Sequence, residues 1–546
     1  MMKIAKPKAY QPPTQITVRG ATSPQGKAYV RVTASGVHAW VPRSAFTGGG
    51  GQALTLLKAA NMPFLSHEWA QCRKKVAAVE SYPLEPLIER PGRNGEYFAL
   101  PDGTVFSPPG VGTPEVLFQK NANKCARAGT IEMWLEATEL LKDQPLATFV
   151  LLAAFVPPFL GLTNQVMNQG FELAGPAGVG KSTLQRFAAA VWGPADDPSG
   201  LNYWINANTT MNALESVMAE HRDMALIIEE MNLYASGESA GVRRRKLNEF
   251  VFKLANGTEK LRFGAADPQR AQFGFITSTN EPLSEMLLGS QVALADAAAD
   301  RLLTIPVTAE RPYGILDSLP KGFRNGSELA EHLNGVIRKC HGVAIRQLLA
   351  RLVEDTAANP QAVAKRLQKR VGIFRRKVGV DGNDGSATRV ADAFGMVYAV
   401  SVFVQRYKAV WFRVAPLTAA LTCYYLHQTT RGKREDPVKL LDSLTDSWET
   451  PYIVHGRYYE MSDEELEEHH AIFREGRGGQ MELLLTEDQL KRAVGNVRVF
   501  LAHPSVQQML LHEPGRKQTK RQVRSNRPFD RFFCFRSPRW QGPLLG

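Results

Sequence analysis

Gly175-Pro176-Ala177-Gly178-Val179-Gly180-Lys181-Ser182 is the stretch that decides the fold, because it has the spacing G-x-x-x-x-G-K-S. It follows the apolar segment Phe171–Ala174 and precedes a helical pattern, Thr183–Trp192. A strand, a glycine-rich loop and a helix in this order predict a P-loop, whose backbone N–H groups and helix N-terminus surround phosphates. Lys181 is expected to reach the β- and γ-phosphates of ATP, and the Ser182 hydroxyl to bind Mg²⁺. The nucleotide site then extends to Thr183; the alternative is a glycine-rich turn that binds nothing.

Two acids follow the next buried strand. Met224–Glu230 is an apolar run that ends in Glu229 and Glu230, and it predicts a strand buried on both faces. Ligands of parallel α/β sheets bind at the carboxyl ends of the strands. We therefore expect Glu229 to lie in the Mg²⁺ shell and Glu230 to orient the attacking water. The alternative is a solvated acidic pair.

A third predicted strand, Phe273–Thr279, ends at Asn280, a polar tip that would contact the γ-phosphate or its water. Further along, Arg301 precedes the apolar Leu302–Pro306. Arg301 is the candidate arginine finger, which one subunit inserts into the site of its neighbour. An ordinary salt bridge at a helix end is the alternative for this residue.

This order of P-loop, paired acids, Asn280 and Arg301 resembles the AAA+ ATPases, specifically the superfamily III helicases of viruses and mobile elements. It resembles still more a helicase-like family of phages, plasmids and cassette elements that is labelled domain of unknown function nine-two-seven. Members of that family more often carry Asp at the position of Glu229. The residues that carry the likeness span roughly residues 20 to 400: Gly95–Thr104, Gly129-Thr130 with Trp134, the P-loop with Ala190–Gly193, Leu254–Gly257 with Lys260 and Arg262, Ser278–Glu281, and Arg389–Ala391 with Phe394.

The resemblance implies a ring, expected to be a hexamer, with ATP held at each subunit junction and one DNA strand in the channel. A hairpin before Asn280 would place Lys260 on the DNA backbone, with Arg262 and Arg270 supporting it. Arg389 would be a second sensor of the γ-phosphate, or else a surface arginine near a helix start. Translocation from 3′ to 5′ is an expectation of the superfamily.

Composition agrees with a soluble cytoplasmic protein without a membrane segment. The chain has 546 residues, 44% of them hydrophobic and 22% charged, and a net charge of +13 that favours a polyanionic partner. The five cysteines form no C-x-x-C pair, which fits a reducing compartment. Met1–Gln15 has no apolar segment typical of a signal peptide, and the longest apolar run, Phe149–Val156, is too short to span a bilayer.

The expected fold class is an α/β P-loop AAA+ core, a parallel sheet flanked by helices, with a small N-terminal α+β domain, helical lid regions and a C-terminal winged-helix-like domain. The expected boundaries are a flexible tail at 1–15, an accessory domain at 16–110, a helical collar at 111–160, the ATPase core at 161–310, a helical region at 311–440 and a DNA-binding domain at 441–546.

The C-terminal prediction rests on a strand at 481–485, helices at 487–501 and 506–511, and a strand at 529–535. This order resembles a winged helix, and the segment before the last strand is rich in cations that phosphate contacts require. A basic solvated tail is the alternative. The candidate DNA contacts here are Arg516, Lys517, Lys520, Arg521 and Arg524.

The expected function is an ATP-dependent DNA helicase of a phage or mobile genetic element, acting on single-stranded and forked DNA. An element-encoded primase, polymerase or single-strand-binding protein would be its partner. Two alternatives stay open: a non-translocating AAA+ switch in defence or regulation, and an origin-binding replication initiator.

Overall fold

A parallel five-stranded sheet forms the centre of the computed structural model, with strand order β11-β7-β10-β9-β8. Every neighbouring pair in it is parallel, so the carboxyl ends of all five strands meet at one edge. The strands are β7 (Gln169–Ala174), β8 (Ile205–Asn206), β9 (Ala225–Glu229), β10 (Gly274–Thr279) and β11 (Leu302–Pro306). The structure describes residues 15–62, 64–163, 168–258, 270–283, 301–308, 311–380, 382, 384–432, 437–445, 450–454, 456–469, 471–476, 479–494, 497–502, 504–512, 517–538 and 540.

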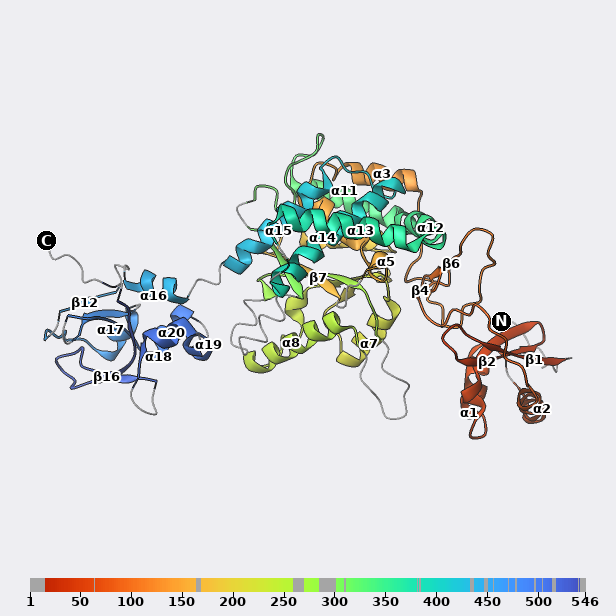
Figure 1. Ribbon diagram of the computed structural model, residues 1–546, viewed down its shortest axis with the longest axis horizontal. Helices are drawn as coiled ribbons and strands as arrows, with labels where there is room; N and C mark the ends of the chain where they lie inside the picture. The colour runs from red at the N-terminus through yellow and green to blue at the C-terminus, as the bar shows by residue number, and fades with distance from the viewer. Residues whose placement is uncertain are drawn as a thin grey trace, which may run out of the picture.

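Both faces of this sheet are buried, as the continuous apolar strands predict. Because side chains alternate along a strand, Ile227 of β9 faces one hydrophobic core while its neighbours Leu226 and Ile228 face another. Helices α7 (Met211–Glu220) and α8 (Ala240–Asn256) cover the second face, below the sheet in Figure 1. The predicted α/β core is therefore confirmed.

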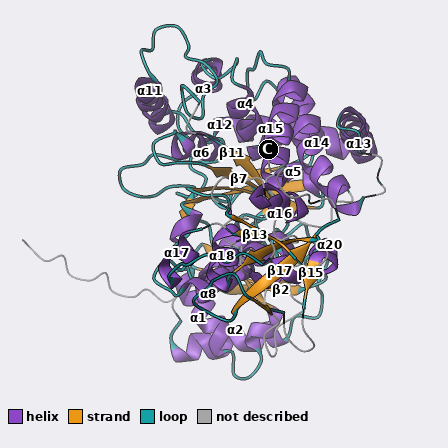
Figure 2. Ribbon diagram, turned by 90° about the vertical axis from the view of Figure 1, so that its left-hand side faces the viewer, coloured by secondary structure: helices purple, strands orange, loops and turns teal. Residues whose placement is uncertain are grey.

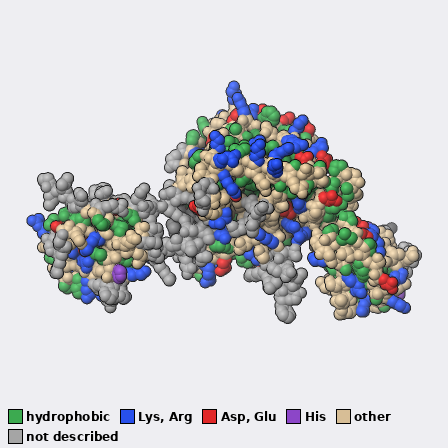
Figure 3. Space-filling view, viewed as in Figure 1, with side chains coloured by type: hydrophobic (Ala, Val, Ile, Leu, Met, Phe, Trp, Pro, Cys, Tyr) green, Lys and Arg blue, Asp and Glu red, His purple; other side chains and the backbone are tan. Residues whose placement is uncertain are grey.

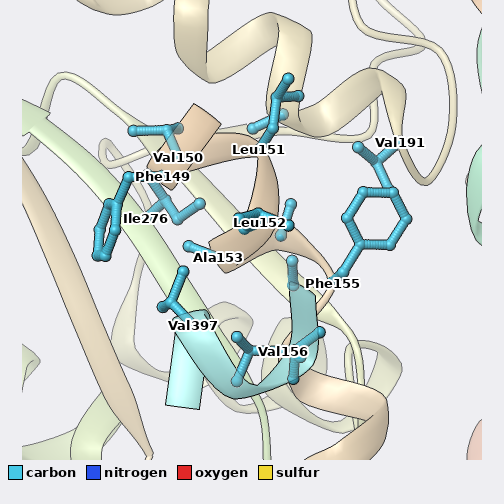
Figure 4. Close-up of a cluster of buried hydrophobic side chains, with 14 of the residues drawn as sticks. Phe149, Val150, Leu151, Leu152, Ala153, Phe155, Val156, Val191, Ile276 and Val397 are labelled. Carbon is cyan, nitrogen blue, oxygen red and sulfur yellow. The ribbon is translucent and has the colours of Figure 1, made fainter. Parts of the chain in front are cut away.

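The first face carries a thick helical layer. Helix α4 (Pro145–Ala154) is buried along its length, and in Figure 4 its Phe149 lies near Ile276 of β10 and its Ala153 near Val397 of α14. Figure 2 shows β7 and β11 beneath helix α15. The layer comprises α3 (Ile131–Glu139), α4, α5 (Pro157–Leu160), α6 (Lys181–Ala190), α11 (Gly326–Lys339), α12 (Val343–Ala358), α13 (Pro360–Lys377), α14 (Gly385–Arg406) and α15 (Pro416–Gly432).

Helix α14 is the one helix of the described residues that is long and apolar enough to cross a membrane. Most of its apolar window is buried inside the protein, against α13, α15 and α4. Such burial is typical of a core helix.

The N-terminal part begins with an antiparallel sheet of β1 (Ile16–Thr22), β2 (Ala28–Ala34) and β3 (Val37–Pro42). A short 3₁₀ turn (Arg43–Phe46) and helices α1 (Gly51–Ala59) and α2 (Ser66–Ala77) pack against this sheet. A second small sheet, β4 (Gly92–Asn94), β5 (Tyr97–Ala99) and β6 (Val105–Phe106), leads to the central part.

The C-terminal part has a mixed sheet in the order β12-β13-β14-β17-β15, with β16 also paired to β17. The predicted helix at 506–511 is wrong at its end, because Leu510 and Leu511 pair with Phe535 and Cys534 as a strand. The strands are β12 (Tyr452–Ile453), β13 (Ile472–Glu475), β14 (Met481–Leu485), β15 (Leu510–Leu511), β16 (Thr519–Arg521) and β17 (Asp530–Arg536). The helices are α16 (Pro437–Thr445), α17 (Asp463–Glu468), α18 (Glu487–Val494), α19 (Val497–Ala502) and α20 (Pro504–Met509).

Candidate nucleotide site

The glycine-rich loop joins the carboxyl end of β7 to the start of α6. Gly180 has a φ of +91° just before the helix, a left-handed conformation that favours glycine. At Gly175 an added Cβ would lie 2.1 Å from the carbonyl oxygen of Val307, so no larger residue fits there. The sequence therefore folds locally into the loop geometry that the motif predicts.

Lys181 turns back onto the loop. Its Nζ donates hydrogen bonds to the carbonyl oxygens of Gly175 at 2.6 Å and Pro176 at 2.7 Å. The side chain is buried, and this burial lowers the pKa of its ammonium group. The loop thus holds a cation at its centre, which fits an anionic ligand such as a phosphate.

A cavity of about 540 Å³ opens over this loop, within the size range of small-molecule sites. The carboxyl ends of β9 and β10 contribute Glu230, Ser278 and Asn280 to its wall. The structure therefore brings together the loop residues Ala177 to Thr183, Glu230 and Asn280, as the sequence predicts. The far wall of the cavity consists of residues 312–316 and one side of α11, and it was not predicted because it carries no motif. The N–H of Ile315 connects this wall to the loop by donating to the carbonyl of Val179 at 2.8 Å.

The two adjacent acids differ in their surroundings. Glu230 is exposed at the cavity and has a left-handed backbone, with a φ of +55°. Glu229 is buried, and Nε of Arg186 on α6 donates to its carboxylate at 3.1 Å. Burial raises the pKa of Glu229, while Arg186 opposes that shift. The structure thus places Glu230 at the predicted site and does not bring the Glu229 carboxylate to the cavity wall.

Sequence reasoning missed Glu172, a fully buried acid in the middle of β7. Its carboxylate accepts hydrogen bonds from the Thr279 hydroxyl at 2.7 Å, the Leu283 N–H at 2.9 Å and the Thr304 hydroxyl at 2.6 Å. Two of these donors flank Asn280, so the loop that carries Asn280 is fixed on both sides. The signal in the sequence is a lone acid inside an otherwise apolar strand, a position that requires buried hydrogen-bond partners.

Arg301 and Arg389 lie away from the cavity wall. The carbonyl of Arg301 accepts a hydrogen bond from the N–H of Gly170, at the amino end of β7 and hence at the opposite edge of the sheet. Its guanidinium lies 4.7 Å from the ring centroid of Phe252. Arg389 is exposed in the second turn of α14. Arg301 is therefore too remote to act on the nucleotide of its own subunit.

A metal site built by the protein alone is not found among the described residues, where no three His, Cys, Asp or Glu side chains converge. Ser182 and the Glu230 carboxylate line one cavity, however. A hydroxyl and a carboxylate are oxygen ligands that suit Mg²⁺ when phosphate oxygens complete its shell. The residues present therefore fit Mg²⁺ bound together with a nucleotide.

Of the predicted DNA contacts, Lys260, Arg262 and Arg516 lie outside the described residues. Arg270 is exposed and forms an antiparallel bridge with Thr258, and these two residues belong to the two arms of the predicted hairpin. In the C-terminal part Lys517 and Lys520 are exposed, and the ammonium of Lys520 lies 4.1 Å from the ring centroid of Phe529.

The structure corrects the prediction for Arg524, which is a buried structural residue. It is 1% exposed, and its guanidinium donates to Asp530 at 2.9 Å and to Asp463 at 2.7 Å. The hydrogen bond from Arg524 is the main cause that lowers the pKa of Asp463, and Arg527 lowers it further. Arg521 is similarly held by Glu482 at 2.9 Å, an acid that also pairs with Arg474 and Arg536. Neither arginine is presented to a phosphate in this arrangement.

Arg524→Ala is expected to destabilise the C-terminal part by about 1.5–3 kcal/mol, because Asp530, whose side chain is 12% exposed, would lose its hydrogen bonds to Arg524 and keep only the longer contact with Arg527 at 3.8 Å. Hydrogen exchange of the β17 amides in the full chain measures this, since local opening free energy sets their protection. Arg527→Ala is the matched control, because Arg527 is exposed and pairs with the same Asp463. Equal protection of β17 in the two variants would contradict the structural role of Arg524.

Comparison with known proteins gives four findings. Residues 29–270 match the family model described as "Domain of unknown function (DUF927)". The solved structure titled "SCCmec type IV Cch - active helicase" is similar with a TM-score of 0.61 and 15% identity, over 97% of this chain and 95% of that chain. At this identity the likeness is one of fold. The structure titled "The A form apo structure of NrS-1 C terminal region-CTR" has 12% identity over 71% of this chain and 88% of that chain. Its TM-score of 0.27 is too low to carry an argument. No curated protein matches the chain.

Proposed function

We propose, from the premise that this chain contains a domain of the DUF927 family at residues 29–270, that it is an ATP-dependent DNA helicase of a phage or mobile element. The fold it shares with a structure titled as an active helicase supports this proposal. The single observation that carries it is the cavity in which the P-loop, Glu230 and Asn280 meet.

The cavity is lined by both polar and apolar groups. Loop N–H groups and Lys181 would surround the phosphates of ATP. Leu141, Ile315 and Leu333 line the wall elsewhere and would contact the base. Mg²⁺ bound by Ser182 and the phosphates would neutralise charge as the bond to the γ-phosphate breaks.

Hydrolysis needs a positioned water. Glu230 is the acid at the cavity, and we assign it the task of orienting and polarising this water. Asn280 would sense the γ-phosphate from the neighbouring strand end. Glu229 would reach Mg²⁺ only after its bond to Arg186 opens, so that Arg186 restrains the second acid.

Glu230→Gln is expected to slow ATP hydrolysis by about 10²–10⁴-fold while nucleotide binding persists, because the amide cannot accept a proton from water. Turnover and binding of a fluorescent ATP analogue measure the two effects separately. Glu281→Gln is the control, since this exposed acid follows Asn280 and does not line the cavity. If Glu229→Gln stops hydrolysis and Glu230→Gln does not, the roles of the two acids are reversed.

The C-terminal part would bind duplex or forked DNA as a winged helix. Its antiparallel strands β14, β17 and β15 neighbour one another in that order, with α18, α19 and α20 between β14 and β15 in the chain. This arrangement is typical of winged helices. Lys517 and Lys520, at the exposed segment before β17, are the described cations that we assign to phosphate contact.

Strand displacement from labelled forks with only a 3′ or only a 5′ tail tests the proposal. Displacement of the 3′-tailed fork alone, dependent on ATP, is the expected result. Intact ATPase without displacement would overturn the helicase proposal and favour a non-translocating switch. Binding confined to one DNA sequence, found by footprinting, would instead favour an origin-binding initiator.

A further inference from the structure

Helix α13 carries an unusual set of charges. Its 18 residues, Pro360–Lys377, include seven cations and no acid: Lys365, Arg366, Lys369, Arg370, Arg375, Arg376 and Lys377. Val363, Leu367 and Phe374 are buried and hold the helix against its neighbours. Thus α13 is an amphipathic helix whose polar side has one sign of charge only.

The exposed cations lie along one side of the helix. At about 100° per residue, Lys365, Lys369 and Arg376 fall within about 40° of one another, and Arg366 and Lys377 extend this arc to about 120°. The three buried residues point to the other side. We call the five exposed cations, Lys365, Arg366, Lys369, Arg376 and Lys377, the α13 stripe.

Two of the seven cations already serve packing. Arg375 pairs with Asp392 of α14, and Arg370 donates to the Tyr398 hydroxyl at 2.9 Å. In contrast, within the described part of the chain none of the five stripe residues has an acid within 4.0 Å. Figure 3 shows Lys and Arg side chains gathered where Figure 1 places α13 and α14.

A solvated helix face is the plain alternative, but such faces mix both signs, as the neighbouring α11 and α12 do with Glu328, Glu331 and Glu354. Like charges at i and i+4, such as Lys365 and Lys369, destabilise a helix unless another group offsets them. A bound polyanion would supply that offset.

We infer that the α13 stripe binds the sugar-phosphate backbone of single-stranded DNA, an inference that rests on the proposed helicase function. From Lys365 to Lys377 the helix rises about 18 Å, the length of about five nucleotides at 3.4 Å each. The stripe contains no aromatic side chain on which a base could stack. Contact is therefore with phosphates, and it does not depend on base sequence.

Helix α13 is packed against the helix that carries the proposed second sensor. The segment from 378 to 384 joins α13 to α14, whose second turn carries Arg389, and the Arg375–Asp392 pair ties the two helices together. DNA on the stripe thus contacts the same rigid pair of helices that presents the proposed second sensor.

The test compares two triple variants of the full chain with the same loss of charge. The stripe variant is Lys369→Gln, Arg376→Gln and Lys377→Gln. The control variant is Lys74→Gln, Lys321→Gln and Lys339→Gln, three exposed lysines on α2, a loop and α11. Fluorescence anisotropy of a labelled oligonucleotide of mixed sequence is measured from low to high salt, and DNA-free ATPase confirms that both variants are folded.

Each lost phosphate contact reduces the magnitude of the slope of log affinity against log salt by about 0.7 for single strands. The slope of the stripe variant should therefore be smaller in magnitude than that of the wild type by about 2. The control should keep the wild-type slope. A stripe variant with the wild-type slope overturns this inference and leaves the helicase proposal standing. A wild-type protein that binds no DNA overturns both.

Discussion

Lys181→Ala is expected to reduce ATP hydrolysis to the level of a protein-free reaction and to abolish strand displacement. The ammonium of Lys181 is the cation inside the loop, held by the carbonyls of Gly175 and Pro176. Phosphate oxygens would take the place of these carbonyls, and without the ammonium the γ-phosphate loses its main protein charge. Phosphate release and binding of a fluorescent ATP analogue measure the effect.

Lys321→Ala serves as the matched control, because this exposed lysine does not line the cavity. Binding of single-stranded DNA in the absence of nucleotide should persist in both variants, which shows that the fold is intact. Hydrolysis by a folded Lys181→Ala variant at more than a small fraction of the wild-type rate would remove the P-loop from the mechanism.

Arg301→Ala is expected to lower ATP turnover by at least about 10³-fold, the smaller end of the effect of an arginine finger. The residue lies at the edge of the sheet opposite to the P-loop of its own subunit, so in the proposed ring it would act only on a neighbouring site. Mixing Arg301→Ala with Lys181→Ala protomers tests this directly. In a mixed ring the second variant supplies an intact Arg301 to the intact P-loop of the first, and turnover should partly return.

Arg413→Ala protomers mixed with Lys181→Ala protomers give the reference, since Arg413 is exposed and does not line the cavity. Arg301→Ala with wild-type turnover would show that the role of this side chain is confined to packing within its own subunit. Loss of turnover without recovery on mixing would instead indicate a structural defect within one subunit.

Much of the core could be predicted because its signals are local. The glycine spacing at 175–182 predicts the loop between β7 and α6, and the apolar runs before Glu229 and Asn280 predict the strands β9 and β10, each from a few consecutive residues. In the same way Thr130 caps α3 and Ser462 caps α17 by hydrogen bonds within three residues. Such features do not depend on the rest of the fold.

The remaining features depend on residues far apart in the chain. The burial of Arg524 follows from Asp463, 61 residues earlier, so the basic composition of its segment was misleading. Adjacent acids after a strand look alike in sequence, whereas Arg186, 43 residues before Glu229, binds only that one. The wall at 312–316 is defined by its approach to Val179 and has no motif of its own.

The buried carboxylate of Glu172 bears on the order in which neighbouring subunits of the proposed ring would hydrolyse ATP. Strand β7 lies between β10 and β11, and this one carboxylate holds hydroxyls of both: Thr279 beside Asn280, and Thr304 three residues after Arg301. In the proposed ring Asn280 faces one nucleotide and Arg301 faces the next. In that ring, a shift at one nucleotide that moves Thr279 would strain the carboxylate that also holds Thr304, and ATP hydrolysis at neighbouring sites would be coupled. The order of ATP hydrolysis around the ring would then be set by three buried hydrogen bonds within each subunit.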